Sequence, residues 1–201
     1  MNVIRQLRQL NPKRPVTTDE ARSIAERQAT RFLRLSGVRE PDVPVDVIAS
    51  LPRVRVELRE RIPVSGSTHW ADGNWLILVN ADDAYVRRRF TLAHEIKHVI
   101  DHPIVDIAYP REGDVTSEDR QELICDYFAA CLLMPRVWVK QHWINGFQNT
   151  CELAQIFGVS RAAMAYRLRD LGLVEPTFRR RKYFRTAPGA PSQRLRELVS
   201  T

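Results

Sequence analysis

The sequence has few cysteines, no long apolar run and little histidine. Its three cysteines form no Cys-x-x-Cys pair, which disfavours both a disulfide framework and a zinc ribbon and leaves three buried thiols as the expectation. The longest apolar run, YFAACLLMP at 127–135, is too short to span a bilayer. The N-terminus has no apolar stretch of signal-peptide length. We therefore expect a cytoplasmic protein.

Acidic residues are almost missing from the C-terminal end. Residues 176–201 hold seven basic residues, with Glu197 as their one acid, whereas the whole chain carries a formal charge of +7. The rest of the chain is therefore close to neutral. A basic tail of this kind can contact nucleic acid or an acidic partner, although a flexible, solvated segment is the simpler interpretation.

Strand patterns lie between residues 53 and 80. RVRVEL at 53–58 alternates apolar and charged residues, as a half-buried strand does. STHWADGNWLILVN at 67–80 is typical of a hairpin, because Asp72-Gly73 suits a two-residue type I′ turn. This register places Trp70 opposite Trp75, which is a stabilising cross-strand pair. We expect a small antiparallel sheet.

Helical patterns surround this sheet. One helix is expected over 21–36, and a second over 82–101, where Asp82 or Asp83 caps the start. Thr116 and Asp119 form a capping box for a further helix at 117–134. Shorter helices are expected over 136–172. Helices that flank a small sheet define an α+β fold.

Three of the five histidines fall within the stretch RFTLAHEIKHVIDH at 89–102. His94 and His98 are four residues apart, so on a helix they lie about 40° apart around the axis and about 6 Å apart along it. Both imidazoles can then reach one ion, and zinc accepts neutral imidazole nitrogen. Glu95 lies beside this face, where it can hold an attacking water. His-Glu-x-x-His on a buried helix therefore predicts a metalloprotease site.

A catalytic zinc needs a third protein ligand. The helix at 117–134 offers Glu122, and Asp126 follows one turn later on the same face. If this helix packs on the histidine helix, Glu122 reaches the metal and Asp126 accepts the N–H of a ligand histidine. Glu118 and Asp119 are rival ligands, which we expect to lie at the solvent-facing start of the helix.

These two segments resemble the ImmA/IrrE family of zinc metallopeptidases. The family pattern is close to R-F-T-x-A-H-E-x-x-H followed by E-x-x-A-[ND]-x-F-A-x-x-L-L-M-P, and the likeness spans roughly residues 21–174. Cys125 stands where the family usually has alanine, and Asp101 where it often has leucine. The resemblance implies a zincin-like, gluzincin-type metallopeptidase domain over 21–175, with residues 1–20 as an N-terminal extension and 176–201 as a tail.

The resemblance also implies roles for individual residues. His94, His98 and Glu122 are the expected ligands of one Zn²⁺ per chain, Glu95 is the expected catalytic base, and Asp126 supports a ligand histidine. Tyr109, His142 and His69 are open candidates for the donor that holds the oxyanion.

The implied activity is hydrolysis of a peptide bond in a protein substrate. Family members tend to cleave helix-turn-helix repressors or antitoxins of mobile elements and stress circuits, and many carry their own Cro-type domain. We expect no room for such a domain before residue 21. A Cro-type repressor or antitoxin on a separate chain is therefore the expected partner.

DNA binding is the alternative prediction. ELAQIFGVSRAAMAYRLRDLGLV at 152–174 is similar to a helix-turn-helix, with Gly158 at the turn and Arg161, Arg167 and Arg169 on the second helix. With the basic tail, this segment could serve a transcriptional regulator or a toxin–antitoxin partner. The competing interpretation is a helix pair that packs on the catalytic helices, with Met164 and Leu168 in the core.

Overall fold

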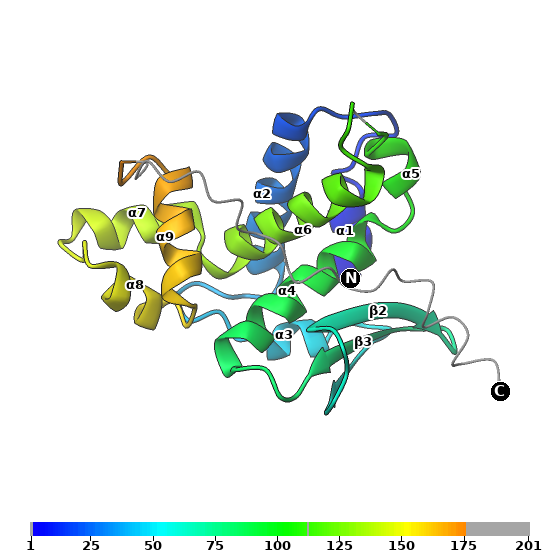
Figure 1. The fold of residues 1–201 in the computed structure, drawn as a ribbon, viewed down its shortest axis with the longest axis horizontal. Coiled ribbons are helices and arrows are strands. Elements are labelled where there is room, and N and C mark those ends of the chain that lie inside the picture. Colours follow the sequence, from blue (N-terminus) through cyan, green and yellow to red (C-terminus); the bar gives the residue numbers. More distant parts are fainter. Residues whose placement is uncertain (1, 112, 176–201) are drawn as a thin grey trace.

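The computed structural model describes residues 2–111 and 113–175, which form an α+β fold (Figure 1). The fold combines helices with a three-stranded sheet that lies at one edge of the molecule. In chain order the elements are α1 (Val3–Arg8), α2 (Thr18–Leu35), α3 (Asp46–Ala49), β1 (Val54–Arg59), β2 (Gly66–Ala71), β3 (Asn74–Asn80), α4 (Tyr85–Asp101), α5 (Val105–Ala108), α6 (Ser117–Leu133), α7 (Arg136–Ile144), α8 (Thr150–Ile156) and α9 (Arg161–Asp170). No helix among the described residues is both long and apolar enough to cross a bilayer.

The predicted hairpin is confirmed. β2 and β3 pair antiparallel with Trp70 opposite Trp75, and the two indole rings meet edge to face with centroids 5.1 Å apart. Asp72 and Gly73 both have positive φ angles, +50° and +74°, as a type I′ turn requires.

The sheet as a whole is mixed, so the expectation of an antiparallel sheet holds only for the hairpin. β1 pairs parallel to β3, and the strand order is β1-β3-β2. The alternation at 53–58 predicts a strand but not its direction. The chain leaves β1, runs through 60–65 to β2, and then returns so that β3 inserts between them. β2 is therefore an edge strand of this sheet.

Two long helices, α4 and α6, form the centre of the molecule. α4 packs on β2 and β3 with one side and on α6 with another, and α6 packs in turn on α2. Figure 1 shows α4 between the sheet and α6. The capping box of Thr116 and Asp119 is present at the start of α6. α4 begins at Tyr85 without a side-chain cap, whereas Asp82 instead accepts a hydrogen bond from the backbone N–H of Arg61 at 2.8 Å.

The N-terminal segment belongs to the core. From the sequence alone, residues 1–20 are an extension, but Ile4 and Leu7 of α1 are buried in the described structure. Arg8 donates hydrogen bonds to the carbonyl oxygens of Val99 at 2.7 Å and Ile100 at 3.3 Å. Arg8 of α1 therefore supplies hydrogen-bond donors to the C-terminal end of α4, where carbonyl groups lack partners within the helix.

Candidate metal centre

α4 presents His94 and His98 towards α6. Their Nε2 atoms lie 3.0 Å apart, and their ring centroids are separated by 4.9 Å. The sequence places them one helical turn apart, and the buried packing of α4 on α6 holds both rings in one space. The structure therefore brings together the two histidines that the motif predicts.

Glu122 of α6 completes this group. Its Oε2 lies 3.2 Å from Nε2 of His94, and its Oε1 lies 3.2 Å from Nε2 of His98. Burial opposes ionisation of Glu122, but the hydrogen bonds to both histidines outweigh it and hold the pKa of this carboxyl below its ordinary value. The Glu122 side chain is 44% exposed, so the group opens to solvent on this side.

Asp126 lies behind His94. Its Oδ1 is 2.9 Å from Nδ1 of His94, and because a carboxylate only accepts, the ring nitrogen donates. This bond turns Nε2 of His94 towards Glu122. Burial alone lowers the pKa of His94, but the hydrogen bonds to Asp126 and Glu122 outweigh burial and raise that pKa to about 10. The metal-free site therefore attracts a positive charge.

Glu95 faces the edge strand β2. Its Oε2 accepts a 2.6 Å hydrogen bond from Oγ1 of Thr68, and the side chain is buried. Gly66 lies next to it: a Cβ there would stand 2.4 Å from Cγ2 of Thr91 and 3.1 Å from Oε1 of Glu95. Thr68 and Gly66 are absent from the sequence prediction, because their contact with α4 depends on how the sheet packs.

Cys125 is a further group in this space. One ligand atom from each of His94, His98 and Cys125 lies within 4.8 Å of the other two. The thiol is fully buried, and burial raises its pKa well above the ordinary value. The burial of Cys125 and Cys131 confirms the expectation of buried thiols, whereas for Cys151, which is exposed, that expectation is wrong. The sequence does not predict that Cys125 lies close to the histidines.

The rival ligands and the oxyanion candidates lie elsewhere or have other partners. Glu118 is exposed and Asp119 accepts the capping-box bond from Thr116, both in the first turn of α6. Tyr109 donates a 2.6 Å hydrogen bond to Asp101. The other two candidates are engaged locally, His142 with the Trp138 carbonyl and His69 with Ser67.

A buried ion pair lies further round α4, where this helix faces α2 and α6. Nζ of Lys97 contacts Asp101 at 2.7 Å, and both side chains are fully buried. Gln28 of α2 accepts a 2.7 Å hydrogen bond from Lys97, and Asn11 donates one of 3.2 Å to Asp101. Asp101, which had no role from the sequence, thus links α4 with α2 and the N-terminal segment.

The α8–α9 pair packs as core rather than as a free recognition unit. Met164 and Leu168 are fully buried, and Arg167 is 2% exposed. Arg167 donates to the Met134 carbonyl at 3.0 Å and to Asp170 at 2.8 Å. Of the three arginines on the predicted second helix, Arg167 is therefore not available for contact with DNA, because its guanidinium is used inside the protein.

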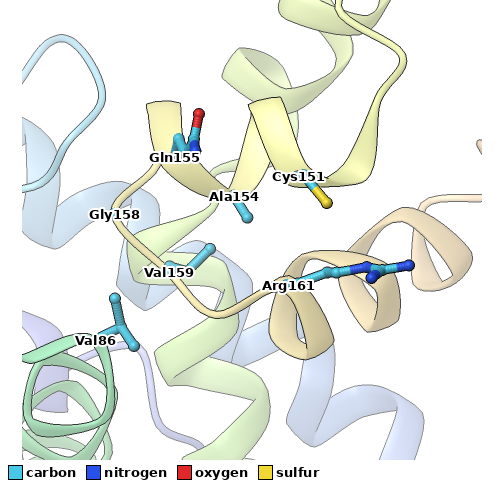
Figure 2. A pocket seen from close by; sticks show the side chains of 7 residues that line it. All are labelled: Val86, Cys151, Ala154, Gln155, Gly158, Val159 and Arg161. Carbon is cyan, nitrogen blue, oxygen red and sulfur yellow. The ribbon is translucent and has the colours of Figure 1, made fainter. Parts of the chain in front are cut away.

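The turn between these helices is fixed against the rest of the domain. Gly158 has φ +59°, and a Cβ there would lie 2.3 Å from Oδ1 of Asp42. Asp42 pairs with buried Arg89 of α4. A cleft of about 430 Å³ lies beside this turn (Figure 2), and its lining residues are Val86, Cys151, Ala154, Gln155, Gly158, Val159 and Arg161. These residues include none of the predicted metal ligands, and the basic tail lies outside the described residues.

The fold and the histidine–carboxylate group define an α+β domain of the metallopeptidase type. The chain belongs to the family described as the IrrE N-terminal-like domain, Peptidase_M78, whose family model matches residues 56–169. The predicted family resemblance is thereby confirmed.

The known proteins to which this chain is similar include the following two. The radiation response metalloprotease IrrE of Deinococcus radiodurans is 34% identical over 114 residues, which are 50% of this chain and 34% of that protein. A solved structure titled Mycobacterium tuberculosis transcriptional regulator superposes with a TM-score of 0.60 at 17% identity, over 83% of this chain and 51% of that chain. The second likeness supports the fold alone. The chain spans about a third of the first protein and about half of the second.

Proposed function

We propose that this protein is a zinc-dependent endopeptidase in which His94, His98 and Glu122 hold one Zn²⁺. The observation that carries the proposal is the convergence of two imidazole nitrogens and one carboxylate, each carboxylate oxygen 3.2 Å from one nitrogen. Two histidines and one glutamate form a donor set that catalytic zinc uses in hydrolases. The raised pKa of His94 supports the fit, since the site favours a cation.

A bound zinc ion supplies Lewis acidity, which activates water and polarises the scissile carbonyl. Glu95 accepts the proton of the attacking water and then delivers it to the leaving amine. Thr68 holds one carboxylate oxygen of Glu95 at 2.6 Å and so fixes its orientation. Asp126 keeps His94 in the tautomer that points Nε2 towards Glu122.

The substrate is proposed to bind as an extended strand along β2. β2 is the edge strand beside β3, and Thr68 on it contacts Glu95. A peptide that pairs with this edge gains backbone hydrogen bonds and passes close to Glu95. The substrate is proposed to be a Cro-type helix-turn-helix repressor or an antitoxin, in line with the family resemblance of the two motifs.

The experiment compares wild-type protein with Glu95→Gln. Each is loaded with zinc and incubated with candidate substrates, first of all any small helix-turn-helix repressor that a neighbouring gene encodes, while bound metal is measured by elemental analysis. The variant should bind one zinc per chain and lose at least about a hundredfold in cleavage rate, because it lacks the general base. Glu118→Gln, an exposed change at the start of α6, is the matched control and should cleave normally. Unchanged cleavage by Glu95→Gln excludes Glu95 as the base.

A further inference from the structure

α6 directs a second potential ligand at the two histidines. Cys125 and Asp126 follow Glu122 by three and four residues, about one turn further along α6, and all three lie near the histidines of α4. Glu122 and Asp126 contact the histidines directly. The Cys125 sulfur lies within 4.8 Å of a ligand nitrogen of each histidine, and its side chain is fully buried.

A thiol at this place changes the chemistry that the site can support. Zinc binds cysteine sulfur as readily as histidine nitrogen, and sulfur and nitrogen ligands of a tetrahedral zinc lie roughly 3.5 Å apart. In this structure the three ligand atoms lie within 4.8 Å of one another, so a shared metal ion requires the sulfur to approach the histidine nitrogens by at most about 1.3 Å. Three protein ligands leave an open position for catalysis, whereas four close the site.

We propose that Cys125 is a fourth protein ligand of the metal and that it closes the site in the resting protein. The inference rests on the proposed metal site at His94, His98 and Glu122. On coordination the thiol loses its proton to solvent and the sulfur occupies the position that a substrate carbonyl needs. Displacement of the sulfur opens the site, so the resting endopeptidase is latent.

Cobalt substitution tests the sulfur ligand without any activity measurement. The full chain is loaded with Co²⁺, and its absorption spectrum is recorded. Wild-type protein should bind one cobalt and show a near-ultraviolet sulfur-to-cobalt charge-transfer band. Cys125→Ala should still bind one cobalt but lack the band. Cys131→Ala is the matched control, because Cys131 is buried on the same helix but is not part of the group around the histidines.

The decisive spectrum is that of the wild-type protein, so it does not depend on the variant's folding. Loss of cobalt binding in His94→Ala shows that the metal occupies the histidine site. If cobalt binds the wild-type protein at that site but gives no sulfur band, the proposed role of Cys125 is wrong, while the proposed metal site stands. If the wild-type protein binds no cobalt at all, the metal site fails and the inference falls with it.

Acetohydroxamate tests the closure, because it binds an open metal position. If the thiol closes the site about nine-tenths of the time, the apparent affinity of the wild-type protein for the probe is about tenfold weaker than that of Cys125→Ala. The perturbation of the cobalt spectrum should therefore require about tenfold less acetohydroxamate in the variant. Equal affinities contradict the closed resting state.

Discussion

At the scale of single residues, the site depends on one hydrogen bond that the sequence predicts. His94 could bind a metal through either ring nitrogen, and the contact of Nδ1 with Asp126 leaves Nε2 for the side of Glu122. A partner of this kind fixes the ring and makes the nitrogen a better ligand. The role of Asp126 is thus to position His94.

Removal of this partner should weaken metal binding. Asp126→Ala is expected to lower zinc affinity by about 10- to 100-fold, because ring orientation and basicity are both lost. Competition with a chelator of known affinity measures the change. Asp106→Ala, in the short helix α5, is a control that should leave zinc affinity as it is; the same affinity in both variants contradicts the positioning role.

The pH dependence of the metal-free protein follows from the raised pKa of His94. A group whose pKa is higher in the folded than in the unfolded state stabilises the fold at pH values below its unfolded-state pKa. This stabilisation is lost as the pH rises through its folded-state pKa. For His94 this window runs from about 6.5 to about 10. The free-energy difference of unfolding between wild type and His94→Gln should therefore shrink from pH 7 to pH 10 in chemical denaturation. A difference that stays constant contradicts this titration.

At the scale of elements, two different kinds of contact hold α4 in place. Its metal-facing side meets α6, while Lys97 and Asp101 form a buried ion pair that reaches Gln28 and Asn11. Removing one partner of such a pair destabilises the fold by more than the intact pair stabilises it, because the remaining charge is buried away from water and unpaired. The pair therefore fixes the position of α4 against α2 and the N-terminal segment.

Breaking this pair should destabilise the whole domain. Asp101→Ala leaves Lys97 buried without its carboxylate and should lower the free energy of unfolding by about 3–5 kcal/mol. The double variant Lys97→Met with Asp101→Leu removes both charges and should cost clearly less. Urea denaturation of both proteins measures this order, and equal losses contradict the ion-pair explanation.

Some elements can be predicted from the sequence and others cannot. α6 and its capping box are predictable because Thr116 and Asp119 lie three residues apart, and the hairpin follows from Asp72-Gly73. The direction of β1 depends on pairing with β3, which lies about twenty residues further along the chain. The place of α1 depends on its packing against α2 and α4, so local patterns carry no signal for it.

At the scale of the whole molecule, the candidate site follows from two local motifs and one long-range contact. His94 and His98 are set by helical spacing, and Glu122 joins them only because α6 crosses α4. The three ligands can nevertheless be predicted together, because the two motifs jointly resemble the family pattern. Thr68, Gly66 and the approach of Cys125 to the histidines depend on tertiary packing, and sequence periodicity does not encode them.

His94, His98 and Glu122 are proposed to share one metal ion. The most direct measurement is anomalous scattering at the zinc absorption edge from crystals of the zinc-loaded protein. We expect one peak per chain, bonded to Nε2 of both histidines and to the Glu122 carboxylate. No peak at this place, or a Glu122 side chain turned away from it, contradicts the account.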